Sequence, residues 1–329
     1  MGKKLFVICA DISAVMVSNG KNALLRLGSE LVRQGCEVQV LFSINKQPHI
    51  ISPFTNLFNK TFDDYRKTEV EADPGQLYLR FNRIRYAQSR LAVYGLQPVV
   101  DLNALKNRDY VVIYPETFSV NPLNAKNVIR YYGFKPGVLN DHESDTAKYS
   151  DDEFKLAASK NLMAEADFTL FDPYIDGLFI KKTMVDWDER SISLVYRGKN
   201  KKFISHPIDC NKIEISRDWP DRVTLAELLH RSKYFFTYDS YSIINIEAIL
   251  AGAIPIFCDN WLMTDDELDS GELGYIPRFS ISDFLNNRVK ITKFENERKK
   301  IINRLIVLQE NWPMEVARLV EKVSQKFCL

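Results

Sequence analysis

The sequence predicts an α/β fold made of two domains, each built on a parallel β-sheet. Two stretches, 5–42 and 234–257, each read as a buried strand, a helix and a second buried strand, which is the pattern of a parallel crossover unit. The length of 329 residues fits two domains better than one, and an apolar fraction of 46% is ample for two cores. We expect domains over 1–186 and 187–310, with a helix at 311–329.

The first crossover begins near the N-terminus. Leu5–Cys9 is a short apolar run typical of a strand, and Val38–Phe42 is the second strand. Between them, a loop through Asn19 and Gly20 leads into a helix, LLRLGSELVRQ, whose leucines form an apolar stripe and which ends before Gly35. The loop lacks G-x-G-x-x-G, so the dinucleotide-binding fingerprint is absent.

The remaining elements are predicted from shorter patterns. The second domain is expected to begin after Asp186. A helix is predicted from Asn121 through NAKNVIRYY to Gly133. From Glu297 onward the sequence reads as helices, with Pro313 near the start of the last. Further strands are expected at 111–114, 168–171 and 192–196, and a further helix at 225–232.

The stretch YFFTYDSYSIINIEAILAGAIPIF, residues 234–257, is the most informative part of the chain. Its aromatic start predicts a buried strand, and its end, Ile254–Phe257, predicts another. Ser240 and Ser242 can each cap the intervening helix by accepting hydrogen bonds from its first N–H groups. Gly252 is placed to end the helix. The turn before this helix therefore faces the carboxyl edge of the sheet, where ligands of open α/β folds bind.

Two acids give this turn a specific chemistry. A helix start presents free N–H groups and a positive dipole end, which suits a phosphate. Glu247 lies about one turn into the helix, where it could accept hydrogen bonds from the hydroxyls of a ribose attached to that phosphate. Asp239 precedes the helix and could reach further along such a ligand. Alternatively, both acids merely complement the helix dipole.

This arrangement resembles the donor site of GT-B glycosyltransferases, whose E-x7-E signature occupies the same strand, turn and helix. Here Asp239 and Glu247 form a D-x7-E variant, and Ala251-Gly252-Ala253-Ile254-Pro255 matches the small-Gly-x-Pro strand that follows. The resemblance covers about residues 190–260. Within the family, the sequence is similar to bacterial polysaccharide and lipopolysaccharide glycosyltransferases. It implies two Rossmann-like domains facing a cleft, with 311–329 packing back on the first.

The resemblance also implies roles for individual residues. Glu247 would hold the nucleotide ribose, and Asp239 would contact the donor sugar or its phosphate side and take part in catalysis. The other donor-binding residues of the turn would be Tyr238, Ser242 and Ile243. Because Asp239 stands where the family has Glu, the donor sugar and the stereochemical outcome are left open.

A basic segment follows the predicted strand at 192–196. Arg197 and Lys202 stand at the R-x4-K interval that many GT-B enzymes place beside the donor diphosphate. Fixed cations stabilise the negative charge that gathers on a leaving nucleoside diphosphate, so neither a metal nor a cofactor is required beyond the donor substrate. A solvated basic loop is the alternative.

Candidates for the acceptor side lie in the first domain. Glu116 follows a predicted buried strand, and a carboxylate there could orient or deprotonate an acceptor hydroxyl. An ordinary surface or capping acid is the alternative.

The acids beside His142 are adjacent in sequence and are not spaced as metal ligands, so we read that segment as a loop. The resemblance adds, as candidate cleft residues, Ser18, Asn19, Gly20 and His142, and Asn121, which lies near Glu116 in sequence, could line the same cleft. Alternatively, Ser18, Asn19 and Gly20 are ordinary turn and cap residues.

Residues 77–96 interleave four arginines with aromatic residues. Such a stretch could meet anionic lipid headgroups or a pyrophosphate-linked lipid acceptor. Alternatively, it is a partly buried helix with a charged exposed face.

Composition excludes several classes of protein. A net charge of +1 without a basic half argues against nucleic-acid binding. The five cysteines are widely spaced without a C-x-x-C pair, so neither a zinc site nor a disulfide framework is predicted. No stretch approaches the ~20 apolar residues of a transmembrane helix. We expect a cytoplasmic protein, with peripheral contact to the inner membrane as an option.

The predicted function is therefore transfer of a sugar from a nucleotide-diphosphate donor to a glycan or lipid-linked acceptor in bacterial surface polysaccharide synthesis. Two alternatives stay open at this point. One is a sugar-nucleotide epimerase or phosphorylase of the same fold. The other is a catalytically degenerate protein that binds a nucleotide.

Overall fold

The computed structural model divides the chain into two compact units, Met1–Asp172 with Asn311–Leu329, and Pro173–Glu310. The second unit thus begins at Pro173, ahead of the expected boundary after Asp186. The residues described are 3–11, 19–43, 85, 89–99, 102–106, 108–116, 118, 121–135, 150, 152–174, 176–180, 185–198, 212–216, 220–258 and 263–329.

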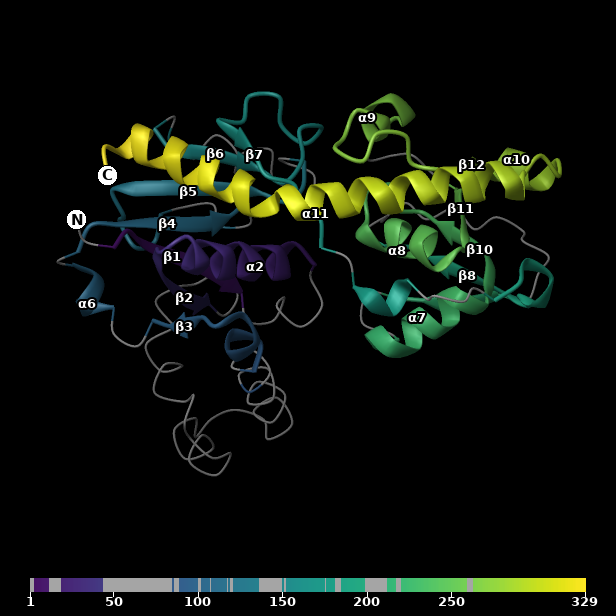
Figure 1. Cartoon of the computed structure of the whole chain (residues 1–329), viewed down its shortest axis with the longest axis horizontal. Helices are drawn as coiled ribbons and strands as arrows, with labels where there is room; N and C mark the ends of the chain where they lie inside the picture. Colours follow the sequence, from purple (N-terminus) through teal and green to yellow (C-terminus); the bar gives the residue numbers. More distant parts are fainter. Residues whose placement is uncertain are drawn as a thin grey trace. The chain divides into compact units, whose positions relative to one another are not determined.

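The first unit contains a parallel sheet. Among its described residues, seven strands pair in the order β3-β2-β1-β4-β5-β6-β7, and every pair is parallel (Figure 1). The central strands are runs of apolar residues because both of their faces are covered. The strands are β1 (Leu5–Asp11), β2 (Glu37–Ser43), β3 (Gln97–Pro98), β4 (Tyr110–Pro115), β5 (Asn127–Tyr132), β6 (Phe154–Ala157) and β7 (Phe168–Thr169).

Helices cover the two faces of this sheet. On one face, leucines of α2 (Asn19–Arg33) pack with Val316, Leu319 and Val323 from the C-terminal end of the chain in one core. The segment 311–329 therefore lies on the first unit. On the other face, Leu105 of α6 (Asn103–Lys106) packs in a second core with alternate residues of the central strands.

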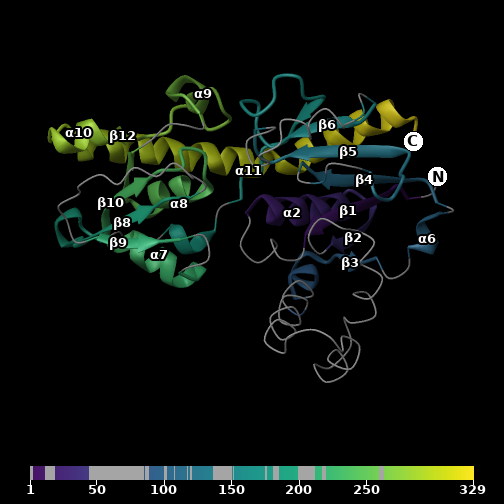
Figure 2. The ribbon, with the colours of Figure 1, turned by 180° about the vertical axis from the view of Figure 1, so that it is seen from behind.

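The second unit contains a smaller parallel sheet. Five strands pair in the order β12-β11-β10-β8-β9 within its described residues (Figure 2). The strands are β8 (Ile192–Tyr196), β9 (Lys212–Ile215), β10 (Ser232–Thr237), β11 (Ile254–Phe257) and β12 (Phe279–Ser280). The helical elements are η3 (Gly177–Phe179), η4 (Trp187–Glu189), α7 (Arg222–Arg231), α8 (Ile243–Ala251), α9 (Asp265–Asp269) and α10 (Ile281–Leu285). The expected α/β fold class with two parallel-sheet domains is confirmed.

The C-terminal part of the chain is one helix, α11 (Ile291–Phe327), and not the several helices expected. Pro313 lies inside it, although a proline removes one backbone hydrogen bond. Buried apolar residues continue on both sides of the proline, with Leu305 before it and Val316 after it. Their packing outweighs the lost hydrogen bond, so the helix continues.

The prediction of a helix from Asn121 to Tyr132 is wrong. Its second half is strand β5, and all six residues of β5 are buried between β4 and β6. Asn121 closes the preceding turn: its Oδ1 accepts a hydrogen bond from the N–H of Ala125 at 3.0 Å, and its Nδ2 donates to the carbonyl of Ala125 at 2.8 Å. The run NVIRYY is β-branched and aromatic, which favours a strand once both faces can be buried.

Candidate functional site

The turn between β10 and α8 is formed as the sequence predicts. β10 ends at Thr237, α8 begins at Ile243, and Gly252 ends the helix with a left-handed φ of 82° before β11. β10 pairs in parallel with β8 on one side and β11 on the other, so the turn lies at the carboxyl edge of the sheet. This edge is where ligands of open α/β sheets bind.

Asp239 is completely buried in this turn, against the loop that leaves β8. A β-carbon placed on Gly198 would lie 2.3 Å from Cβ of Asp239 and 2.5 Å from its Oδ2. Gly198 also has a φ of +60°, which L-residues rarely adopt. Only a glycine fits here, and the fold thereby brings the start of the basic segment into contact with the first acid of the D-x7-E pair.

Asn245, a residue that sequence reasoning missed, holds the turn from inside the helix. Its Nδ2 donates to the carbonyl of Asp239 at 2.9 Å and to that of Ser240 at 3.1 Å. Thr237 adds a hydrogen bond from its Oγ1 to the carbonyl of Asp239 at 3.1 Å. The only sequence signal was a lone amide within an apolar helix segment. In the structure this side chain is almost fully buried.

The start of α8 lacks the side-chain caps that we expected. Ser242 is the N-cap residue but makes no side-chain hydrogen bond to the helix, and the buried Oγ of Ser240 has no hydrogen-bond partner among the residues that the structure describes. The expectation that these serines cap the helix is therefore wrong, because the N–H of Asn245 donates to the carbonyl of Ser242 at 3.0 Å and not to a serine side chain. A bound anion could satisfy both the Ser240 hydroxyl and the first N–H groups of the helix.

Glu247 is buried on α8 and forms an ion pair with Arg222, the first residue of α7. Nη1 of Arg222 donates to Oε1 of Glu247 at 2.8 Å, and Nη2 donates to Oδ2 of Asp176 at 3.1 Å. Burial acts to lower the pKa of Arg222, but the two carboxylates outweigh it and raise the pKa above its ordinary value. Neither Arg222 nor Asp176 was found from the sequence, because no short spacing links them to Glu247.

The other donor-side candidates have mixed environments. Arg197 pairs with Glu214 of β9 at 2.7 Å, and both side chains are about half exposed, at 49% and 55%. Tyr238 is almost fully buried, and its N–H donates to the carbonyl of Tyr196 at 2.9 Å. Ile243 is exposed at the start of α8. Lys202 lies outside the described residues.

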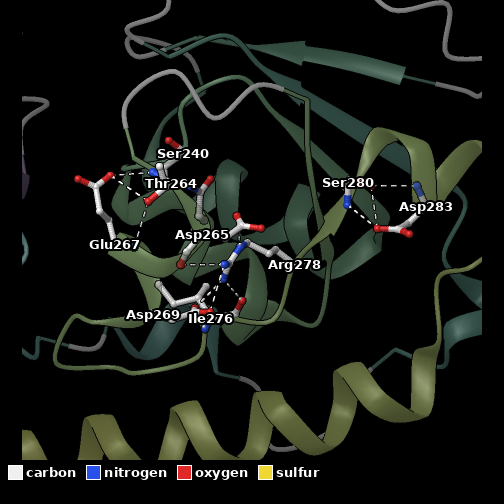
Figure 3. Close-up of polar contacts among 10 residues, drawn as sticks. Ser240, Thr264, Asp265, Glu267, Asp269, Ile276, Arg278, Ser280 and Asp283 are labelled. Atoms are coloured by element: carbon white, nitrogen blue, oxygen red, sulfur yellow. Dashed lines mark hydrogen bonds and ion pairs between the residues drawn. The ribbon is translucent and has the colours of Figure 1, made fainter.

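Polar bonds connect the described residues between β11 and β12. Arg278 is almost buried and bonds Asp265 at 3.0 Å and Asp269 at 2.7 Å, which ties the residues after α9 back onto that helix (Figure 3). Thr264 and Glu267 form a capping box at the start of α9. These bonds link Arg278 to α9 and close the start of that helix.

The acceptor-side candidates lie in the first unit. Glu116 follows β4, and its Oε2 accepts a hydrogen bond from the N–H of Gly133 at 3.2 Å. Asn121 uses its amide to close a turn. Asn19 and Gly20 belong to the first turn of α2 and not to the loop in which we expected them. Ser18 and His142 fall outside the part of the chain that the structure describes.

Arg90, from the arginine-rich stretch, makes contacts within the first unit. Its Nη2 donates to Tyr94 Oη at 2.6 Å and to Asn22 Oδ1 at 3.2 Å, and the neighbouring Leu91 is buried. These contacts fit the alternative of a partly buried helix for residues 89–94.

Within the described ranges, no three His, Cys, Asp or Glu side chains come together as a metal site would require. None of the helices described combines the length and apolar character needed to cross a bilayer.

Comparisons with known proteins identify the fold. No known protein-family profile matches the chain, and no curated protein matches its sequence. A protein assigned as a UDP-N-acetylglucosamine 2-epimerase from Listeria monocytogenes aligns with a TM-score of 0.50 and 11% identity, over 99% of this chain and 97% of that chain. A glycosyltransferase from Rickettsia africae aligns with a TM-score of 0.46 and 10% identity, over 99% of both chains. The glycosyltransferase SnogD from Streptomyces nogalater aligns with a TM-score of 0.43 and 12% identity, over 97% of this chain and 99% of that chain. The Listeria structure shares the two-domain parallel-sheet fold over almost its whole length.

Proposed function

We propose that this protein is a metal-independent glycosyltransferase that moves a sugar from a nucleoside-diphosphate donor to a glycan or glycolipid acceptor. The observation that carries the proposal is the packing of Gly198 against Asp239 at the start of α8. It places a buried acid, a helix start without a side-chain cap and the first residues of a basic segment at one edge of the sheet. Such a combination suits a sugar linked to a diphosphate.

Each part of the donor has a proposed binding group. The diphosphate would lie at the start of α8, near the unpartnered hydroxyl of Ser240, with Arg197 and Lys202 as its cations. Arg197 would exchange its exposed pairing with Glu214 for a phosphate oxygen. Glu247, paired with Arg222, would accept hydrogen bonds from the ribose hydroxyls.

The chemical step follows from where charge develops. When the bond between the sugar and the diphosphate breaks, negative charge grows on the leaving nucleoside diphosphate, and the helix start and the cations stabilise it. Asp239 would contact the sugar, and Glu116 would take the proton of the attacking acceptor hydroxyl. We place the enzyme in the cytoplasm, in bacterial surface polysaccharide synthesis, on the strength of the sequence resemblance.

The direct test is release of nucleoside diphosphate from UDP-, GDP- and ADP-sugars, with and without glycan acceptors. Glu247→Gln keeps the shape of the ribose group and removes its charge, and Arg197→Ala removes one cation. We expect each variant to lower the rate of release at least tenfold, the loss typical of a lost charged hydrogen bond. Glu227→Gln and Arg231→Ala change exposed residues of α7 and serve as matched controls with unchanged rates.

Three results would distinguish the alternatives. Interconversion of sugar nucleotides without transfer would indicate an epimerase, and phosphate-dependent cleavage would indicate a phosphorylase. Nucleotide binding without turnover would indicate a degenerate enzyme. If no nucleotide binds and the Glu247 and Arg197 variants behave like wild type, the proposal is wrong.

A further inference from the structure

The guanidinium of Arg222 is fixed by three contacts, and the side chain that carries it remains partly exposed. Its two terminal nitrogens bond Glu247 and Asp176, and its central carbon lies 4.7 Å from the ring centroid of Phe179. Phe179 is completely buried, so it forms a rigid support beneath the cation. Even so, 43% of the Arg222 side chain is exposed. The result is a planar cation that is held at its edges, supported by an aromatic ring and open to solvent.

The negative charge of Glu247 does not by itself require an arginine at position 222. A lysine would also supply a positive charge beside the buried carboxylate. Arginine adds a flat surface, because the guanidinium is planar and stacks on aromatic systems. The bonds to Asp176 and to Glu247 hold that surface in one orientation. A fixed, accessible plane of this kind is a platform for a flat ligand.

The proposed function indicates which flat ligand would lie there. If Glu247 binds the 2′- and 3′-hydroxyls of the donor ribose, the base is attached to the ring carbon next to C2′, beside the same carboxylate. The diphosphate end points to the start of α8, so the base extends the other way. Arg222 is bonded directly to Glu247, from the helix α7 that packs beside α8. The base therefore comes to the exposed side of Arg222.

We propose that Arg222 is the platform on which the nucleobase of the donor stacks, an inference that rests on the proposed function. Two of the guanidinium nitrogens are already bonded to carboxylates, so recognition is through the flat face of the base. Every base has such a face, and a larger purine ring covers more of the platform than a pyrimidine.

The test separates the base from the rest of the nucleotide. Calorimetric titration compares ADP, GDP and UDP with ribose 5-diphosphate, which keeps the ribose and diphosphate and lacks the base. Arg222→Lys retains a cation beside Glu247 and Asp176 and removes the plane. We expect Arg222→Lys to weaken binding of the preferred nucleoside diphosphate about tenfold or more, the range of base stacking on a side chain, and to leave binding of ribose 5-diphosphate unchanged.

Each other outcome has a definite meaning. Equal weakening of both ligands would show that Arg222 acts only by positioning Glu247, and would overturn the platform. Wild-type protein that binds ribose 5-diphosphate as tightly as the nucleotides would also overturn it, while leaving a sugar-diphosphate site in place. Wild-type protein that binds none of the four ligands would refute the proposed function itself. Arg231→Lys, on the exposed end of α7, is the matched control, and thermal unfolding checks that each variant folds.

Discussion

Gly198 and Asp239 lie in backbone-to-side-chain contact, close enough that a β-carbon on Gly198 would stand 2.3 Å from Cβ of Asp239. The contact joins the end of β8 to the turn after β10, two strands that are neighbours in the sheet. It therefore holds Gly198, the residue after Arg197, against the first acid of the turn.

Gly198→Ala should destabilise the second unit and impair the donor site. Two costs combine: a left-handed φ, about 1–2 kcal/mol for a residue with a β-carbon, and overpacking against Asp239, about 1–3 kcal/mol more. Urea unfolding measures the loss of stability, and nucleotide titration measures the effect on the site. Gly95→Ala is the matched control, because Gly95 has a φ of +66° with no atom within 4 Å of the added β-carbon. Equal losses for the two variants would contradict a steric role for Asp239.

Asn245→Ala should loosen the turn without altering either acid of the D-x7-E pair. The variant leaves the carbonyls of Asp239 and Ser240 without their amide donor inside the protein, which costs about 1–3 kcal/mol. Urea unfolding measures this, and donor affinity should fall as the turn becomes mobile. Asn286→Ala, at the exposed end of α10, removes a comparable amide bond to the carbonyl of Ser282. That control should lose less than half as much stability, and a similar loss would argue against a special role for Asn245.

Arg298→Met should weaken the far end of the site helix. Arg298 is almost buried, and its guanidinium donates to the carbonyls of Ile249 at 2.9 Å and Leu250 at 2.6 Å, at the C-terminus of α8. Burial lowers the pKa of this guanidinium, and the carboxylate of Glu295, 3.6 Å away, partly opposes that shift. Methionine keeps the apolar volume and leaves the carbonyls unsatisfied, which should cost about 1–3 kcal/mol in urea unfolding.

The control for Arg298 is an exposed arginine on the same helix. Arg318 pairs with Glu315, and both side chains are exposed, at 57% and 36%. Arg318→Met should cost no more than about 0.5 kcal/mol. A loss for Arg298→Met that does not exceed this value would show that the carbonyl bonds contribute little.

Asp283 should make part of the free energy of unfolding depend on pH. Hydrogen bonds from Ser280, at 2.7 Å from its Oγ and 3.1 Å from its N–H, lower the pKa of Asp283. A carboxyl whose folded pKa lies below its unfolded value of about 3.9 contributes stability above that value, and the contribution is lost as the pH falls through the folded pKa.

Asp283→Asn should therefore lose stability at neutral pH and show a smaller further loss on acidification below about pH 4 than wild type. Thermal unfolding across the acid range measures both. Asp266→Asn, in the first turn of α9, makes the same change of charge without this capping bond. If the Asp283 and Asp266 variants follow the same acid dependence, the hydrogen bonds between Ser280 and Asp283 do not carry the effect.

Local pattern was sufficient for the strand, turn and helix around Asp239. β8 and β11 begin and end at the predicted residues. The turn residues on either side of each apolar run mark where the strand begins and ends. The same reasoning failed at Asn127–Tyr132, where an expected helix is the buried strand β5. A short apolar run fits a helix or a strand, and pairing with β4 and β6 makes it a strand.

The amino-acid order alone therefore specified an α/β chain with two sheets and placed two acids at the carboxyl edge of the second sheet. Folding added the partners that give those acids their environment. Arg222 meets Glu247 and Asp176 across 25 and 46 positions of sequence, and Gly198 meets Asp239 through neighbouring strands. Periodicity records which face of an element is buried, whereas a contact between distant side chains depends on how the elements pack, and no local spacing records it.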